Sequence, residues 1–370
     1  MQRHRLYSNW VEIDLGAIEN NVRFYRQHTA TQVMAIVKAN AYGHGAVPVA
    51  QACLRAGAAW LGVARPEEAL ELRRAGITAP LLLLGYTPPG RYEEAIANHL
   101  SLTVWNAEQV QIAAQAAKKI GETARLHIKV DSGMSRLGLP PEEALELARV
   151  VDQTAGVLLE GVFTHFARAD ESQPAASDLQ ERRFRQALQA LEAAGLRPPL
   201  VHAANSAASL SRPSAWFNLV RTGIAIYGLH PSAECPLPPE FRPALAWKTV
   251  LSHVKVLPGG QGVSYGHVYV TQGEERIGTA PVGYADGFRR MLGNWALVGG
   301  RRVPVIGRVC MDQIMLQLDG VSAAQAGDEV VLIGRQGDEH ITAEEVAQRW
   351  GTINYEVTCG LAARVPRVYC

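Results

Sequence analysis

Short apolar runs alternate with helix-like segments over the first two thirds of the sequence. Each run has the length and character of a buried strand. Strands that alternate with helices form a parallel sheet, either a closed (β/α)8 TIM barrel or an open, doubly wound sheet. Eight runs over roughly the length of a TIM barrel favour the barrel, although alternation alone does not separate the two folds. The runs are Met34–Val37, Trp60–Ala64, Leu81–Leu84, Leu102–Trp105, Leu126–Val130, Gly161–Phe166, Leu200–Ala203 and Val220–Tyr227.

The segments between these runs carry the start and stop signals of helices. Pro66–Gly76 opens with a proline and two glutamates and closes with a glycine, as helix ends prefer. Asn106 is a predicted N-cap for Ala107–Ile120, and Gly121 is its stop. Similar signals predict helices at Leu15–His28, Ala46–Ala56, Pro140–Val151 and Asp178–Ala194.

The sequence changes in character near residue 236. Four prolines between Pro236 and Pro243 indicate a linker, and helical periodicity then largely disappears. We therefore expect a barrel over residues 14–238 and a mostly-β domain over residues 239–370. The predicted elements of the second domain are strands at Thr249–Val256, Gly266–Val270, Arg276–Pro281, Arg302–Ile306, Gln313–Leu318 and Glu329–Ile333 and a helix at Thr342–Trp350.

Overall charge and short motifs argue against several classes of function. A net charge of +1 disfavours a nucleic-acid or anionic-membrane partner. No signal peptide or membrane span is recognised, and five scattered cysteines fit a reduced cytoplasmic protein. The sequence has no C-x-x-C, H-E-x-x-H, G-x-G-x-x-G or G-x-x-x-x-G-K motif, so neither a metal site nor a nucleotide site is predicted.

Lys38 is the most informative candidate for chemistry. It ends the run Met34–Val37 and precedes a turn-rich segment, Ala39–Gly45, which leads into a helix. Catalytic groups of α/β proteins collect at this edge of the sheet. Loss of water there favours the neutral amine, which is a nucleophile. The alternative is a lysine that snorkels from a strand end.

Polar residues follow other predicted strands at the same edge. Arg136 lies in a glycine-rich turn, and its guanidinium suits a carboxylate or a phosphate. Asn205 and Ser206 precede a helix, where they could bind phosphate, cap the helix, or do both. His165 ends a strand, where a lone histidine is more often a core residue, and Gly223 allows a close backbone approach to phosphate.

The segment Gly262–Gly266 reads G-V-S-Y-G, which matches the nucleophile-elbow pattern of serine hydrolases. That motif requires a strand before the serine and a helix after it. The residues that follow, His267–Val270, are strand-like instead. We therefore reject the hydrolase interpretation.

The run Val37–Gly45, V-K-A-N-A-Y-G-H-G, resembles the lysine motif of bacterial alanine racemases, which depend on pyridoxal 5′-phosphate. Further motifs follow in family order along nearly the whole chain. The resemblance implies a TIM barrel and a β domain whose sheet is joined by the first strand, within residues 1–13. It also implies that Lys38 carries the cofactor and that the enzyme interconverts L-alanine and D-alanine, which supplies peptidoglycan.

The resemblance further implies one base on each face of the substrate Cα, with Lys38 on one face and Tyr265 on the other. Tyr265 would come from the second subunit of a homodimer. Arg136 and the backbone N–H of Met311 would bind the substrate carboxylate. Lys129 would carry a carbamate that orients Arg136, since an unmodified ammonium there would be an unfavourable buried like charge.

The resemblance assigns the other site residues to three groups. The residues expected at the cofactor are Lys38, Tyr42, His165, Asn205, Ser206, Arg221, Gly223, Ile224 and Tyr355. Two supporting residues are His202 and Asp312. The residues expected at the entrance are Asp170, Tyr284, Arg290, Arg308 and Ile353.

The sequence alone leaves several alternative functions open. A fold-type III pyridoxal-phosphate decarboxylase shares the fold and the cofactor, but it usually places an acid at the pyridine nitrogen where the resemblance puts Arg221. An arginine keeps the ring neutral and limits side reactions such as transamination. A non-catalytic cofactor carrier would need the barrel alone. Serine as a second substrate and a role in alanine breakdown also stay open.

Overall fold

The computed structural model describes residues 6–370, so residues 1–5 of the predicted segment 1–13 lie outside the described part. The chain separates into two compact units. One unit is Gly16–Arg242, and the other combines residues 6–15 with Pro243–Cys370. The first unit is therefore an insertion in the chain that forms the second.

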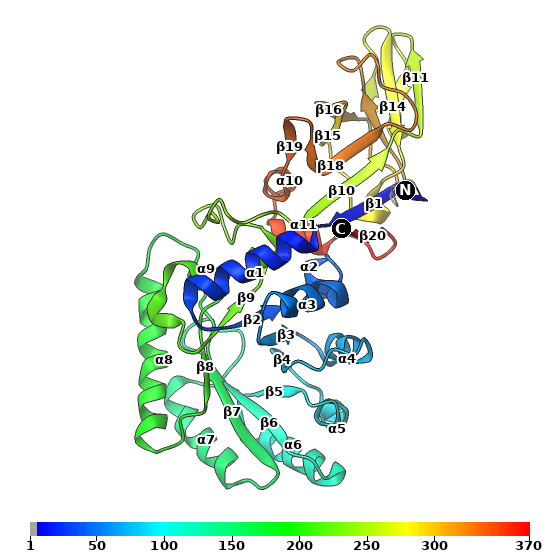
Figure 1. The fold of residues 1–370 in the computed structure, drawn as a ribbon. Helices are drawn as coiled ribbons and strands as arrows, with labels where there is room; N and C mark the ends of the chain where they lie inside the picture. The colour runs from blue at the N-terminus through cyan, green and yellow to red at the C-terminus, as the bar shows by residue number, and fades with distance from the viewer. Residues whose placement is uncertain (1–5) are drawn as a thin grey trace. The chain divides into compact units, whose positions relative to one another are not determined.

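The unit Gly16–Arg242 contains an eight-stranded parallel sheet in the order β8-β7-β6-β5-β4-β3-β2-β9. The helices lie along the outer side of these strands, and the predicted TIM barrel is confirmed (Figure 1). The strands are β2 (Gln32–Ile36), β3 (Trp60–Val63), β4 (Leu81–Leu83), β5 (Ser101–Val104), β6 (Ala124–Lys129), β7 (Val157–Phe163), β8 (Leu200–His202) and β9 (Leu219–Thr222).

The strands β8 and β9 form the seam at which the barrel closes. They share no regular ladder. Hydrogen bonds outside a ladder join them instead: the Arg221 N–H donates to the Ala204 carbonyl at 2.9 Å, the Val201 N–H donates to Asn218 Oδ1 at 2.9 Å, and Arg221 Nη1 lies 3.0 Å from His202 Nδ1. The seam thus places two predicted site residues, His202 and Arg221, on neighbouring strands.

The helices begin and end largely as their caps predict. Asn106 Oδ1 accepts a hydrogen bond from the Gln109 N–H at 2.9 Å, and Gly121 ends the same helix in the left-handed region. The helices of this unit are α1 (Leu15–Thr29), α2 (Lys38–Tyr42), α3 (Ala46–Arg55), α4 (Pro66–Arg74), α5 (Tyr92–Ala97), α6 (Ala107–Ile120), α7 (Ala144–Gln153), α8 (Ala175–Ala193) and α9 (Ser206–Ser211).

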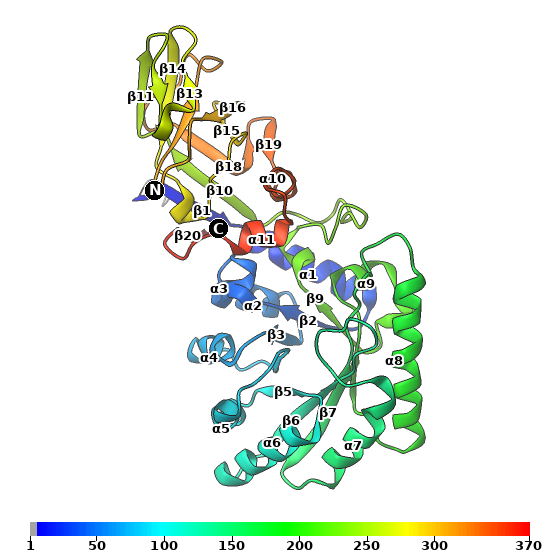
Figure 2. The same cartoon turned by 180° about the vertical axis from the view of Figure 1, so that it is seen from behind.

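The second unit is built on a large sheet in the order β11-β14-β17-β16-β15-β18-β10-β1-β20, with β19 paired to β18 (Figure 2). The strands of this sheet are β1 (Asn9–Ile13), β10 (Leu245–Val250), β11 (His253–Leu257), β14 (Glu275–Ala280), β15 (Trp295–Val298), β16 (Arg301–Ile306), β17 (Ile314–Gln317), β18 (Glu329–Gln336), β19 (Glu339–Ile341) and β20 (Arg367–Tyr369). A hairpin and two helices complete the unit: β12 (Gly262–Val263), β13 (Tyr269–Val270), α10 (Ala343–Trp350) and α11 (Asn354–Cys359).

The strand β1 lies between two strands that are distant in sequence. It is antiparallel to β10 and parallel to β20. The Cys370 N–H donates to the Ile13 carbonyl at 3.0 Å, and the Leu15 N–H donates to the Cys370 carbonyl at 3.0 Å. Residues from both ends of the described chain therefore complete one sheet.

Several strand predictions were too long. The run Gly161–Phe166 is a strand only to Phe163, and Gly266–Val270 is a strand only at Tyr269–Val270, after a 3₁₀ turn. The run Val220–Tyr227 is a strand only to Thr222, because Gly223 turns the backbone and Ile224–Tyr227 forms a 3₁₀ turn. The run Thr249–Val256 is two strands. The first strand, β10, pairs with β18, and the second, β11, pairs with β14. The break between them is at Leu251 and Ser252.

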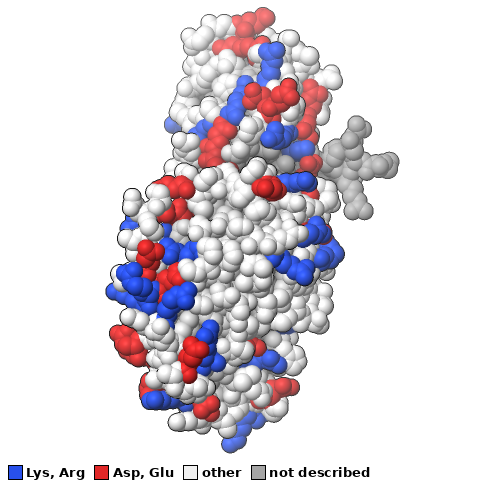
Figure 3. Space-filling view, turned by 60° about the vertical axis from the view of Figure 1, so that its left-hand side comes forward, with Lys and Arg blue, Asp and Glu red and all other residues white. Residues whose placement is uncertain are grey.

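Two features concern the surface charge and the helices of the chain. Acidic and basic side chains are interspersed on the face drawn in Figure 3, in keeping with a net charge of +1. Within residues 6–370, no helix combines the length and the apolar character that a membrane span requires.

Candidate active site

Lys38 stands where β2 ends and the backbone enters a left-handed turn. The four residues that follow, Ala39–Tyr42, all have φ of 52° or 53°. A non-glycine residue in this region costs about 1–2 kcal/mol. Four consecutive cases are unusual, so the surroundings must hold the turn in place.

Side chains on both sides hold this turn. Glu68 Oε1 accepts the Ala39 N–H at 2.5 Å, while Glu68 Oε2 accepts the Ala64 N–H at 2.8 Å. Asn40 Oδ1 accepts the Ala46 N–H at 2.8 Å at the start of α3. The half-buried Lys38 is therefore attached to a fixed backbone at the carboxyl end of β2.

Tyr42, Ser206 and Gly223 form a narrow cradle between the end of β9 and the start of α9. Ser206 Oγ accepts the Gly223 N–H at 2.8 Å. A Cβ at position 223 would lie only 2.6 Å from the Tyr42 hydroxyl oxygen, so the cradle requires glycine. Asn205 caps α9 by accepting the Ala208 N–H at 3.0 Å, and Ile224 is buried. Hydroxyl and N–H donors around a glycine are suited to a phosphate group.

Arg221 is buried at the end of β9. Its Nη1 donates to His202 Nδ1 at 3.0 Å, and its Nη2 lies within 3.1 Å of acceptors on Thr164, Ala203 and His165. Burial lowers the pKa of Arg221 to about 9, which still leaves the guanidinium charged at neutral pH. The Nε–H has no acceptor among residues 6–370, so a donor remains for a ligand.

The two histidines beside Arg221 are neutral. Burial lowers the pKa of both His165 and His202 well below the usual range, and the charge of Arg221 lowers both further. Arginine has only donors, so the ring nitrogen that faces it on each histidine must be an acceptor. A neutral ring satisfies that requirement.

Lys129 is a buried amine at the end of β6. Its Nζ donates to the Val130 carbonyl at 2.9 Å and lies 5.4 Å from the centre of the Phe163 ring. Burial, with help from Arg221, lowers the pKa of Lys129 to about 7. A large fraction of this amine is therefore uncharged near neutral pH.

The loop that carries Arg136 is organised by Asp131. Its Oδ1 accepts the N–H groups of Gly133, Met134 and Ser135 at 2.9–3.0 Å. Burial opposes ionisation of Asp131, but these three donors outweigh it and lower its pKa. Arg136 itself is exposed at the end of this fixed loop.

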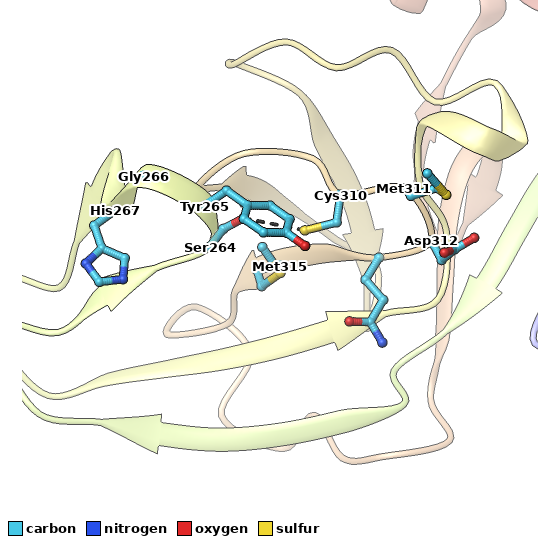
Figure 4. Close-up of a pocket in the computed structure, with 9 residues that line it drawn as sticks. Ser264, Tyr265, Gly266, His267, Cys310, Met311, Asp312 and Met315 are labelled. Carbon is cyan, nitrogen blue, oxygen red and sulfur yellow. Dashed lines mark hydrogen bonds between the residues drawn. The ribbon is translucent and has the colours of Figure 1, made fainter.

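A pocket of about 570 Å³ lies in the second unit and brings together three predicted residues, Tyr265, Met311 and Asp312 (Figure 4). Tyr265 is 68% exposed and begins a 3₁₀ turn after Ser264, whose φ is 66°. Ser264 Oγ donates to the Arg308 carbonyl at 2.6 Å. A turn and a strand follow this serine, so the structure does not form a nucleophile elbow.

The Met311 backbone offers a free donor to this pocket. Its carbonyl accepts the Ala285 N–H at 3.0 Å, whereas its own N–H has no acceptor among residues 6–370. Asp312, which also lines the pocket, is paired with Arg364 at 2.8 Å. An anionic group could therefore bind at Met311.

The remaining predicted residues occupy exposed or half-buried positions. Arg308 lies beside Gly266 in the second unit, and Tyr284 donates its N–H to the Cys310 carbonyl at 3.0 Å. Asp170 is half-buried, and its carbonyl accepts the Ser232 hydroxyl at 2.7 Å. The others are Arg290 and Ile353, both exposed, and Tyr355, half-buried on α11.

Most of the predicted barrel residues thus lie at the carboxyl ends of the strands, and Tyr265, Met311 and Asp312 line the pocket of the second unit, whereas Arg290, Ile353 and Tyr355 lie outside that lining. Sequence reasoning missed Glu68, His127 and Glu160. His127 lies two residues before Lys129, and residues two apart in a strand point to the same face. This spacing was an available signal that His127 lies on the same face as Lys129. No such signal in the sequence marked Glu68, because an acidic residue in the first turn of a helix is common.

Comparison with known proteins gives one family for both units. Residues 13–231 match "Alanine racemase, N-terminal domain", and residues 244–369 match "Alanine racemase, C-terminal domain". The alanine racemase of Symbiobacterium thermophilum is 48% identical over 97% of this chain and 96% of its own.

Solved structures agree with this comparison. The alanine racemase of Bacillus anthracis with bound L-Ala-P has a TM-score of 0.92 and 45% identity, covering 98% of this chain and 95% of its own. The histidine racemase of Leuconostoc mesenteroides subsp. sake has a TM-score of 0.91 and 29% identity, covering 98% of each chain.

Proposed function

Because the chain belongs to the alanine racemase family, we propose that it interconverts L-alanine and D-alanine with pyridoxal 5′-phosphate as its cofactor. Lys38 and Tyr265 would be the two bases, each serving one face of the substrate Cα. The observation that carries this proposal is the rigid placement of Lys38 on the turn at the end of β2, on the same barrel edge as Arg221 and the Gly223 cradle.

The residues of the barrel fit this cofactor. Ser206, Tyr42 and the backbone at Gly223 would hold the phosphate, and the glycine is needed because a Cβ would crowd the Tyr42 hydroxyl. Arg221 would donate to the pyridine nitrogen through a remaining N–H. When bound, the cofactor withdraws electrons from the substrate Cα and makes its hydrogen acidic.

The choice of arginine at position 221 favours racemisation over decarboxylation. A charged guanidinium only donates hydrogen bonds, so Arg221 would pair with an unprotonated ring nitrogen and would disfavour a protonated one. Arg221 would thus moderate the electron withdrawal that the cofactor supplies, which disfavours side reactions such as decarboxylation and transamination. The neighbouring His165 and His202 are neutral and supply no proton to the ring.

Two groups would bind the substrate carboxylate. The Met311 N–H is one free donor, and the exposed guanidinium of Arg136 is the other. Charge-assisted hydrogen bonds of this kind would fix the orientation of the amino acid. Fixed orientation aims the Cα–H bond at one base and leaves the opposite face open to the other.

Incubation of the cofactor-loaded protein with L-alanine tests the function. We expect D-alanine to accumulate until the two enantiomers are equal, without release of carbon dioxide. Carbon dioxide would indicate the decarboxylase, and neither product would indicate a carrier. Parallel assays with L-serine and L-histidine measure substrate breadth, since a relative of similar fold is a histidine racemase. The proposed cytoplasmic enzyme would supply D-alanine for peptidoglycan. Growth of a D-alanine auxotroph that carries this gene, without added D-alanine, would test this supply.

A homodimer with shared sites is part of this proposal, and the exposure of Tyr265, which a second subunit would cover, supports it. Lys38→Ala and Tyr265→Ala subunits should each be inactive alone. Refolded or exchanged together, they should recover up to about one quarter of wild-type activity, because a mixed dimer has one intact site and random mixing makes half the dimers mixed. Subunit exchange proved by mass spectrometry without recovery would contradict a shared site.

The low pKa of Lys129 supports the proposed carbamate, because only an uncharged amine reacts with carbon dioxide. We expect a carbamate carbon signal in the ¹³C NMR spectrum of protein equilibrated with ¹³C-bicarbonate. The signal should be absent from Lys129→Ala and present in Lys118→Ala, in which an exposed lysine is replaced. Equal spectra for wild type and Lys129→Ala would rule out the modification.

A further inference from the structure

A continuous chain of side-chain hydrogen bonds runs through the barrel from Arg221 to Glu160. Arg221 Nη1 lies 3.0 Å from His202 Nδ1, and His202 Nε2 lies 3.0 Å from His127 Nδ1. His127 Nε2 then lies 3.1 Å from Glu160 Oε2. The chain crosses β9, β8, β6 and β7, and every side chain in it is buried.

The direction of each hydrogen bond follows from Arg221. Because arginine only donates, His202 Nδ1 must accept, and the His202 proton must be on Nε2. His202 Nε2–H then donates to His127 Nδ1, so the His127 proton is also on Nε2. That proton points at Glu160, which as a carboxylate can only accept.

At the Glu160 end of this hydrogen-bond series, further donors keep the carboxylate of Glu160 an acceptor. The Ser101 hydroxyl donates to Glu160 Oε2, and Arg125 Nη1 donates to Oε1 at 3.1 Å. Burial opposes ionisation of Glu160, but the hydrogen bonds from His127 and Ser101 outweigh it and lower its pKa. Burial lowers the pKa of His127, in spite of Glu160, which fits a neutral ring.

The barrel also makes room for the His127 ring. A Cβ at Gly161, on the adjacent strand β7, would overlap the ring atoms of His127. Gly161 follows Glu160 directly, so one dipeptide supplies both the space and the acceptor. The His127 position is therefore a fitted site and not a chance polar residue in the core.

We propose that Glu160 and His127 are positioning residues for Arg221: from the middle of β7 and β6, they fix the tautomer of His202. If either were lost, the opposite tautomer of His202 would become accessible and would place an N–H against an N–H of Arg221. The guanidinium would then shift from its alignment. This inference rests on the proposed function, in which Arg221 contacts the cofactor.

Tautomers can be read directly in the cofactor-loaded wild-type protein. With ¹⁵N-labelled histidine, we expect the imidazoles of His127 and His202 to be neutral and protonated on Nε2, and we expect the same of His165, whose Nδ1 also faces Arg221. Single His127→Gln and His202→Gln variants assign the two signals. A wild-type His202 that is protonated on Nδ1, or charged, would overturn the proposal.

The variant Glu160→Gln tests the coupling to Arg221. A glutamine has one accepting oxygen, so it cannot satisfy both His127 and Arg125. We expect a mixture of histidine tautomers, a shifted visible absorbance of the bound cofactor, and a kcat about tenfold lower with KM little changed. The control Glu122→Gln, at an exposed position just before β6, should match wild type in all three.

Unchanged absorbance, tautomers and kcat in folded Glu160→Gln would refute the proposal. If this variant does not fold, Ser101→Ala, which keeps the carboxylate and removes one donor, should show the same changes to a smaller degree; wild-type spectra in folded Ser101→Ala would refute it equally. Wild-type protein that binds cofactor without racemising alanine would refute the proposed function instead, and the tautomers read in that sample tell the two failures apart.

Discussion

Replacing Lys38 with alanine should lower the kcat for alanine racemisation by about 10⁴-fold or more, since it removes both a base and the point of cofactor attachment. The left-handed turn after Lys38 is held by backbone hydrogen bonds to Glu68 and Asn40. The substitution should therefore leave the fold intact. Far-ultraviolet circular dichroism and the rate of D-alanine formation measure the two effects separately.

A chemical label gives an independent reading of the same variant. Borohydride reduction should fix the cofactor on the peptide that contains Lys38 in wild type and should label no peptide in Lys38→Ala. Lys118→Ala, which changes an exposed lysine on α6, should behave as wild type. Label recovered on Lys129, the other amine at this barrel edge, would contradict the assignment.

Replacing Tyr265 with phenylalanine should lower racemisation by about 10²–10⁴-fold, because it removes one of two bases. The two directions share one equilibrium constant, so kcat/KM must fall equally for both enantiomers. The equilibrium constant does not constrain the exchange of the Cα hydrogen with deuterium from D₂O. It should survive for the enantiomer that faces Lys38 and be lost for the other.

The control for this variant is Tyr269→Phe. Tyr269 lies four residues away, and its hydroxyl donates to Glu275 at 2.6 Å, outside the pocket. It should racemise alanine at close to the wild-type rate. Equal loss of deuterium exchange from both enantiomers in Tyr265→Phe would contradict a base on each face, and so would unchanged racemisation.

The barrel was predictable because each strand and helix carries its own signals. Asn106 caps α6 as expected, and glycine ends the same helix. Strand ends were less predictable where the cause is tertiary. The break at Leu251 and Ser252 arises because the backbone changes its sheet neighbours, and no local propensity encodes that change.

Lys38 could be singled out from its own chemistry at a strand end, whereas Arg221 was proposed only through the family resemblance. The left-handed turn at Ala39–Tyr42 was predicted only as a turn-rich segment, because two alanines and a tyrosine have no preference for positive φ. His127 and Glu160 were missed because single polar residues in apolar strands give no sign that they meet. Their contact depends on the register between β6 and β7, which includes an irregularity.

The position of β1 in its sheet has a consequence for how the protein is made. Its neighbours β10 and β20 are synthesised more than two hundred residues later, a delay of roughly ten seconds or more on the ribosome. During that time β1 is an open edge on a nascent chain, and such edges invite pairing with other copies. Glu12, which later pairs with Lys248 at 2.9 Å, is the charge in this strand that opposes premature aggregation.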